Sequence, residues 1–228
     1  MICIPIVAAT NEEAMKQMDK CFSLADVVEL RIDFIRNVNL TKLLSAKKGK
    51  VIVTARKKDE GGNFEGDEEK RFFLLSKAVI LRADFIDIEL STDETFTKKL
   101  LGDIRKHGDQ TNLIVSHHDF NGTPSESKLQ NIFNECVGRG AHIVKIVTFA
   151  NSAEDNLKIL KLISYAKKTN RKIIALCMGE KGKISRIMAP YFGSYLSFAS
   201  LEKGAESAPG QLTVEEMREI FRILKDEE

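Results

Sequence analysis

One lysine interrupts an apolar segment in the middle of the chain. The segment AHIVKIVTFA, residues 141–150, places Lys145 between apolar neighbours on both sides, as in a buried strand of a parallel sheet. Because burial disfavours an ammonium group, part of this amine should be neutral. A neutral lysine amine is a nucleophile that forms Schiff bases with carbonyl compounds. The simpler interpretation is a lysine that pairs with a carboxylate or extends past the strand end.

Two adjacent histidines, His117 and His118, end another apolar segment, IVSHHDF. An ordinary imidazole titrates near neutral pH, so a histidine in this position is a candidate general acid and base. If the strand continues through both residues, their side chains point to opposite faces, and only one can face a site. We interpret the other two histidines, His107 and His142, as structural residues.

Charged residues follow two further apolar segments. Glu29 and Arg31 alternate with apolar neighbours in VVELRID, which indicates either a Glu29–Arg31 pair, a ligand contact or an internal salt bridge between barrel layers. Arg56 stands just after VIVTA. Glu60 precedes Gly61 and a second glycine, which permit an unusual backbone path in a loop there.

The last third of the chain offers groups that suit an anionic ligand. Arg186 carries a planar fork of donors that can hold a carboxylate, although a loop arginine is commonly a surface residue. Ser207 and Gln211 bracket the segment SAPGQ, whose small residues suit either a flexible flap or an ordinary connection. That segment lacks the glycine-rich helix start that is typical of a phosphate site.

Short apolar strands alternate with amphipathic helices along the chain. The pattern predicts strands at residues 2–8, 27–32, 51–54, 85–89, 112–116, 143–149, 172–176 and 195–198. It predicts helices at residues 12–22, 40–45, 68–81, 94–106, 125–139, 154–168, 183–188 and 214–224. Eight such alternations predict an α/β fold, a (β/α)8 TIM barrel in which residues 1–228 form a single catalytic domain. The alternative is a doubly wound open sheet. In a barrel, the functional residues would lie at the C-terminal strand ends.

Composition excludes several classes of protein. The 35 Lys and Arg nearly balance the 33 Asp and Glu, which argues against nucleic acid as a partner. The four cysteines are scattered without metal-ligand spacing, so we expect no metal site and reduced thiols in a cytoplasmic protein. The segment MICIPIVAAT predicts a strand and not a signal peptide. We expect no membrane association, because no apolar run approaches the ~18 residues that span a bilayer.

Six segments together resemble type I 3-dehydroquinate dehydratase, the Schiff-base dehydratase of the shikimate pathway of aromatic amino acid biosynthesis. They are ELRID (29–33), TARKKDEGG (54–62), SHHDF (116–120), VKIVTFA (144–150), MGEKGKISR (178–186) and SAPGQ (207–211). Each segment alone is weakly specific, but six in the family's order cover nearly the whole chain. One departure is His117, where many family members have tyrosine, which affects how the neighbouring histidine packs.

The resemblance implies a role for each matching residue. Lys145 would form the Schiff base, His118 would be the general acid and base, and Glu60 would orient that histidine. The substrate 3-dehydroquinate would be bound by the following residues: Glu29, Arg31, Arg56, Arg186, Ser207 and Gln211. The family needs no metal or other cofactor and is usually a homodimer. The alternatives are a class I aldolase-like Schiff-base barrel and a non-catalytic barrel that binds a small acid.

Overall fold

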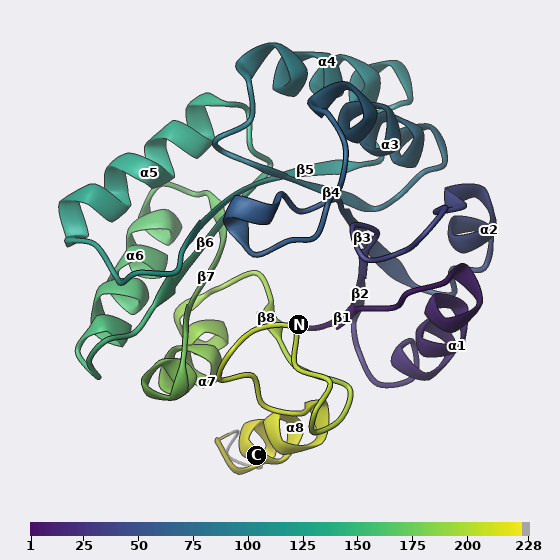
Figure 1. The fold of residues 1–228 in the computed structure, drawn as a ribbon. Helices are drawn as coiled ribbons and strands as arrows, with labels where there is room; N and C mark the ends of the chain where they lie inside the picture. Colours follow the sequence, from purple (N-terminus) through teal and green to yellow (C-terminus); the bar gives the residue numbers. More distant parts are fainter. Residues whose placement is uncertain (225–228) are drawn as a thin grey trace.

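The computed structural model describes residues 1–224, in which eight parallel strands form a barrel surrounded by helices (Figure 1). The strands are β1 (Ile2–Ile6), β2 (Val27–Arg31), β3 (Lys50–Thr54), β4 (Phe85–Glu89), β5 (Asn112–Asp119), β6 (Ile143–Phe149), β7 (Lys172–Met178) and β8 (Ser197–Phe198). The α-helices are α1 (Asn11–Cys21), α2 (Leu40–Ser45), α3 (Glu68–Ile80), α4 (Glu94–Lys106), α5 (Glu126–Gly138), α6 (Asp155–Lys168), α7 (Lys183–Phe192) and α8 (Val214–Leu224). Two short 3₁₀ helices, η1 (Lys58–Glu60) and η2 (Glu180–Gly182), follow β3 and β7. None of the helices within residues 1–224 is long and apolar enough to cross a bilayer.

The strands follow one another around the barrel in chain order. Each strand pairs in parallel with the next from β1 to β7, and β8 returns to pair with β1. Beside β8 the amide of Tyr195 donates to the carbonyl oxygen of Ile173 in β7 at 2.7 Å, so the barrel is nearly closed. The predicted TIM barrel is therefore confirmed, and the open doubly wound sheet is wrong.

Side chains at several helix starts explain where those helices begin. Thr10, Asp67 and Ser125 each accept a hydrogen bond from a backbone amide in the first turn of α1, α3 and α5. Before α8, Thr213 Oγ1 accepts from the amide of Glu216, whose carboxylate accepts from the amide of Thr213. These caps satisfy amides that lack a partner within the helix.

The inside of the barrel has an apolar floor beneath a charged layer. Alternate strand residues point inward, and those near the strand starts are apolar, including Cys3, Val27, Ile52 and Ile114. Two residues further along, the inward positions carry the following polar side chains: Glu29, Thr54, Asp87, Ser116 and Lys145. The opposite faces of the strands pack against the helices in a separate, larger apolar core. The floor thus excludes water from below the charged layer.

Several element boundaries differ from the sequence-based prediction. β5 and β7 extend beyond residues 116 and 176 to Asp119 and Met178, because they pair with the long strand β6 as far as Thr148 and Phe149 respectively. Helix α7 continues beyond residue 188 to Phe192 and contains Pro190. β8 is shorter than predicted and begins at Ser197. The extension of β5 matters most, since it places both adjacent histidines within a strand.

Candidate active site

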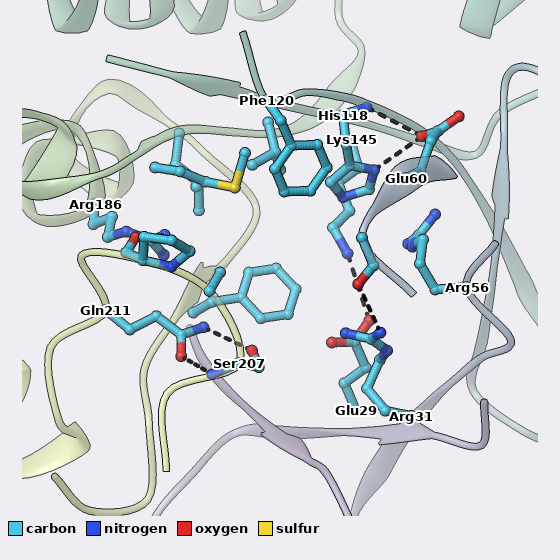
Figure 2. Close-up of a pocket in the computed structure, with 17 residues that line it drawn as sticks. Glu29, Arg31, Arg56, Glu60, His118, Phe120, Lys145, Arg186, Ser207 and Gln211 are labelled. Atoms are coloured by element: carbon cyan, nitrogen blue, oxygen red, sulfur yellow. Dashed lines mark hydrogen bonds and ion pairs between the residues drawn. The ribbon is translucent and has the colours of Figure 1, made fainter. Parts of the chain in front are cut away.

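A pocket opens at the C-terminal ends of the strands, above the charged layer (Figure 2). Every site residue that the sequence predicted lines it: Glu29, Arg31, Arg56, Glu60, His118, Lys145, Arg186, Ser207 and Gln211. Apolar side chains that the prediction did not include complete the wall: Phe120, Val147, Leu176, Met178 and Phe198. The TIM barrel therefore brings together groups that lie far apart in the sequence.

Lys145 lies at the bottom of this pocket with its side chain nearly covered. Its Nζ is 2.9 Å from Oδ2 of Asp87 and 3.5 Å from Oε1 of Glu29. The same nitrogen lies 4.6 Å from the centre of the Phe198 ring. Two carboxylates and one aromatic ring therefore surround the amine at the bottom of the pocket. Of the two interpretations of this lysine, pairing with a carboxylate is confirmed, and the paired amine still faces the pocket.

Asp87 is a site residue that the sequence prediction missed. It is buried on β4 and accepts hydrogen bonds from Lys145 and from Ser116 Oγ, the latter at 2.7 Å. Arg56 Nη2 lies 2.7 Å from its Oδ1. Burial raises the pKa of Asp87, but the charges of Arg56 and Lys145 outweigh it and hold that pKa far below its usual range. The available signal was the inward alternation of acidic residues along β4.

His118 and Glu60 form a pair beside the lysine. Both His118 Nδ1, at 3.1 Å, and the His118 backbone amide, at 3.2 Å, lie within hydrogen-bond distance of Oε2 of Glu60. Burial, together with the charges of Arg56 and Lys145, lowers the pKa of His118 well below its ordinary value. Burial also raises the pKa of Glu60. We assign a neutral imidazole whose proton sits on Nδ1, which leaves Nε2 with a free lone pair.

The adjacent His117 does not line the pocket. β5 continues through both histidines, so their side chains alternate between the inner and outer faces of the barrel. The expectation that only one of them can face the site is confirmed, and that residue is His118.

The turn η1 places Glu60 against the histidine. Ser91 Oγ donates to Oε1 of Glu60 at 2.9 Å and fixes the carboxylate from the other side. Gly61 follows with φ of 77°, a left-handed conformation that glycine adopts without strain. A Cβ on Gly61 would clash with the ring of Phe120. The predicted unusual backbone path is confirmed, and the close contact with Phe120 explains why glycine stands there.

Glu29 and Arg31 do not pair with each other, so that prediction is wrong. The Arg31 guanidinium binds both carboxylate oxygens of Asp33, at 2.9 and 2.7 Å. Glu29 instead accepts from Thr54 Oγ1 at 2.7 Å and lies near Lys145. Glu29 and Arg31 both lie within β2 and extend in parallel from the strand. Asp33 lies in the turn after the strand, where its carboxylate can face the planar end of the Arg31 guanidinium.

Arg186 reaches the pocket from α7, on the opposite side from Arg56 and Glu60 (Figure 2). Only 1% of this residue is exposed, and its Nη2 donates to the carbonyl oxygen of Pro209 at 3.1 Å. Its Nε is the one buried side-chain nitrogen or oxygen within the described residues that has no hydrogen-bond partner. Burial lowers the pKa of Arg186 to about 10. A buried guanidinium of this kind can accept an anion from the pocket.

The segment between β8 and α8 forms the wall next to Arg186. The amide of Ser207 donates to Gln211 Oε1 at 2.8 Å, and Gln211 Nε2 donates to Ser207 Oγ at 3.0 Å. The amide of Gly179 donates to the carbonyl oxygen of Pro209 at 3.1 Å and joins this segment to the end of β7. Figure 2 shows the Ser207–Gln211 pair at the edge of the pocket. This pair thus offers a hydroxyl and an amide at the pocket wall.

Metal ligands do not gather in the part of the chain that the structure describes, because no group of three or more His, Cys, Asp or Glu residues there could hold an ion. The pocket instead combines an amine, a neutral imidazole with a carboxylate partner, and a guanidinium open to an anion. Fold and site together define a TIM-barrel enzyme.

Comparisons with known proteins give the family. The family described as Type I 3-dehydroquinase matches residues 2–228. The 3-dehydroquinate dehydratase of Methanocaldococcus jannaschii is 42% identical over 98% of this chain and 99% of its own. The chain belongs to the type I 3-dehydroquinase family, and it is a hydro-lyase.

Solved structures agree with this assignment. The 3-dehydroquinate dehydratase of Geobacillus kaustophilus superposes with a TM-score of 0.90 at 26% identity, covering 98% of this chain and 90% of that one. The type I enzyme of Clostridium difficile, solved with covalently modified comenic acid, superposes with a TM-score of 0.88 at 26% identity and covers 98% and 91%. The same barrel geometry is therefore found in solved members of the family.

Proposed function

We propose that the chain eliminates water from 3-dehydroquinate to give 3-dehydroshikimate, through a Schiff base on Lys145. The observation that carries this proposal is the meeting of three groups in one pocket: the Lys145 amine, His118 backed by Glu60, and the Arg186 guanidinium across from them. A substrate with a ketone, a neighbouring acidic C–H bond and a carboxylate would meet all three groups at once.

The chemistry explains why an amine is needed. Removing a proton next to a ketone leaves a carbanion that the ketone stabilises only modestly, whereas a protonated imine withdraws electrons far better. Lys145 must lose a proton before it can attack the ketone carbon. The carboxylates of Asp87 and Glu29 lie 2.9 and 3.5 Å from Nζ, so they would balance the positive charge of the protonated imine.

His118 would move the protons. The amine adds to the ketone and one water leaves as the imine forms. Nε2 of His118 then takes the proton from the adjacent carbon, and the resulting enamine expels the hydroxyl, which leaves as a second water with the proton that His118 returns. A water then hydrolyses the conjugated imine and frees Lys145, so that the net reaction releases one water. Glu60 would keep the imidazole proton on Nδ1 throughout.

The remaining predicted residues would hold the substrate. Arg186 would bind the carboxylate through donors that have no carboxylate partner within residues 1–224, an orientation effect worth several kcal/mol in general. Glu29, Arg31, Arg56, Ser207 and Gln211 would contact the carboxylate or the hydroxyl groups. Covalently modified comenic acid in the C. difficile relative supports covalent chemistry at this kind of site.

The wider biological setting is part of the same proposal. We infer that the chain acts in the shikimate pathway of aromatic amino acid biosynthesis, as a single catalytic domain in a cytoplasmic homodimer without a cofactor. The names of the relatives support the pathway, since each is called 3-dehydroquinate dehydratase.

One assay tests the reaction. Purified protein is mixed with 3-dehydroquinate, and the conjugated acid product is followed by its near-ultraviolet absorbance. We expect product to accumulate stoichiometrically with substrate loss. No increase in absorbance with folded protein would contradict the proposal, and cleavage of a carbon–carbon bond detected by mass spectrometry would indicate an aldolase-like enzyme.

A further inference from the structure

A line of alternating charges runs from outside the barrel wall to the lysine. It begins at Arg71 on helix α3 and continues through Glu89 on β4, Arg56 after β3 and Asp87 on β4 to Lys145. Each member contacts the next, and all five are at most 5% exposed. Arg71 and Glu89 do not line the pocket, so neither is placed to touch a ligand.

Arg71 has a partner on every donor group. Nη1 donates to a carboxylate oxygen of Glu89 and to the carbonyl oxygen of Ala55. Nη2 donates to Thr92 Oγ1 at 2.6 Å and to Glu68 at 2.8 Å, and Nε donates to Glu68 at 3.1 Å. A guanidinium held in this way has one orientation only, and it fixes the Glu89 carboxylate with it.

Glu89 connects the two halves of the site. Its Oε1 accepts from the amide of Lys57 at 3.0 Å, and the same oxygen lies 3.1 Å from Nη1 of Arg56. Lys57 immediately precedes the turn that carries Glu60, the partner of His118. Arg56 in turn contacts Asp87, the partner of Lys145. One carboxylate therefore helps to place both the acid–base pair and the amine.

This network is an unusual way to fill the space behind the pocket. A buried ion pair seldom gives more stability than apolar side chains of the same volume, because both charges lose their hydration. An apolar residue at position 71 would leave Glu89 with a single cationic partner and freedom to turn toward Arg56. The presence of a buried Arg71–Glu89 pair is explained if the reaction requires the Glu89 carboxylate to be held in one position.

We propose that Arg71 is a positioning residue for the dehydration. It holds Glu89, and through Glu89 it fixes the Arg56 guanidinium beside Asp87 and Lys145 and the Lys57–Glu60 turn beside His118. The inference rests on the proposed function and adds a residue outside the pocket to it. Without Arg71, Glu89 turns further toward Arg56 and draws the Arg56 guanidinium away from Asp87, which misaligns the amine and the imidazole together.

The test compares Arg71→Met, Arg71→Lys and Glu89→Gln with a matched control. Leu75→Ala on the same helix removes a buried side chain that takes no part in the network, and it measures how far destabilisation alone lowers activity. We expect kcat to fall about 10- to 100-fold in Arg71→Met, in the range of small misplacements of reacting groups. We expect Arg71→Lys to keep the charge without the fork and to fall between Arg71→Met and wild type.

A double-mutant cycle identifies the route of the effect. If Arg71 acts through Glu89, the double variant Arg71→Met/Glu89→Gln loses much less than the product of the two single losses. Borohydride trapping at Lys145 should slow by a factor similar to the loss in kcat. Fully additive effects, or a kcat for folded Arg71→Met equal to that of Leu75→Ala, would overturn the inference.

The wild-type protein separates this result from failure of the proposed function. If wild type releases no product from 3-dehydroquinate, the proposed function fails. If wild type is active and every folded position-71 variant matches it, only the role of Arg71 fails. Should Arg71→Met not fold, Arg71→Lys and Glu89→Gln still decide, because each is expected to lower kcat beyond the Leu75→Ala control.

Discussion

Two arginines face the same pocket from opposite sides, and their surroundings differ. Arg56 contacts Asp87, Glu89 and the hydroxyl of Ser116. Within residues 1–224, the Arg186 guanidinium has one hydrogen-bond partner, the carbonyl oxygen of Pro209, and its Nε has none. Burial lowers the pKa of both guanidinium groups, but the neighbouring Asp87 and Glu89 reverse that effect and raise the pKa of Arg56 above its ordinary value. Without such neighbours, the pKa of Arg186 falls to about 10.

We interpret the difference as that between an arginine of the structural framework, Arg56, and a candidate substrate-binding arginine, Arg186. Arg56 is paired with Asp87 and Glu89 inside the protein, and in our proposal this pairing holds the amine and the imidazole in place. Arg186 has no ion pair within residues 1–224, so under the proposed function its charge would be balanced by the substrate carboxylate. Substitutions at the amine, the imidazole and the two arginines should therefore have distinct effects on turnover, stability and binding.

Removal of the amine should have the largest effect. Lys145→Ala is expected to lower kcat by about 10⁴-fold or more, because no other residue lining the pocket can form the imine. Circular dichroism and thermal unfolding should show a folded barrel, since Asp87 keeps Arg56 as a partner. Activity similar to wild type would end the assignment of this residue.

Removal of the imidazole should come next. His118→Ala is expected to lower kcat about 10²- to 10⁴-fold, the usual contribution of general acid–base catalysis. The control His117→Ala should retain activity, because His117 does not line the pocket. Equal loss in both variants would show that packing in β5, and not proton transfer, causes the effect.

The pH profile tests the same histidine. In the proposed mechanism His118 acts in its neutral form, and its buried position lowers its pKa well below the usual value of about 6.5. The acidic limb of kcat/KM should therefore lie below pH 6.5, with a plateau above it. In the unfolded chain this histidine takes up its proton at higher pH, so its contribution to folding stability is complete above about pH 6.5 and falls below it. An acidic limb above pH 7 would contradict the assignment.

Replacing each arginine by methionine tests the comparison of Arg56 and Arg186 directly. Arg56→Met leaves Asp87 and Glu89 buried with one cation fewer and should lower the free energy of unfolding by about 3–5 kcal/mol. Arg186→Met removes a buried cation that has no ion pair in the described chain, and it should change that free energy by less than about 1 kcal/mol. Urea unfolding measures the free energy of unfolding of both variants. Equal losses of stability would contradict the proposed difference between Arg56 and Arg186.

The same substitution should weaken substrate binding. Loss of a charge-assisted pair costs about 1.5–3 kcal/mol, so Arg186→Met should raise KM for 3-dehydroquinate about 10- to 150-fold. A carboxylate product should raise the melting temperature of wild type but not of Arg186→Met. Equal stabilisation of both proteins would place the anion elsewhere.

The smallest effect is expected at the wall beside Arg186. Gln211→Ala removes one hydrogen-bonding amide that pairs with Ser207, which costs about 0.5–1.5 kcal/mol or a 2- to 10-fold rise in KM. Steady-state kinetics measures it. A fall in kcat without a change in KM would contradict a binding role.

The order of strands and helices could be predicted because alternating apolar and charged residues indicate each element independently. The ends of the strands could not be predicted in the same way, because β5 reaches Asp119 only by pairing with β6. The site residues at strand ends followed from the barrel and from family motifs. The ion-pair partner of each charged residue could not be predicted. Asp87 and Lys145, for example, are separated by 58 residues and meet only through the register of β4, β5 and β6. The same limit produced the wrong Glu29–Arg31 pair.

The central claim is that the Lys145 amine attacks a ketone in this pocket. Wild-type protein and Lys145→Ala are incubated with 3-dehydroquinate and sodium borohydride, digested, and analysed by peptide mass spectrometry. We expect a stable adduct on the peptide that contains Lys145 in wild type and none in the variant. An adduct on another lysine, or no adduct while product is still released, would contradict it.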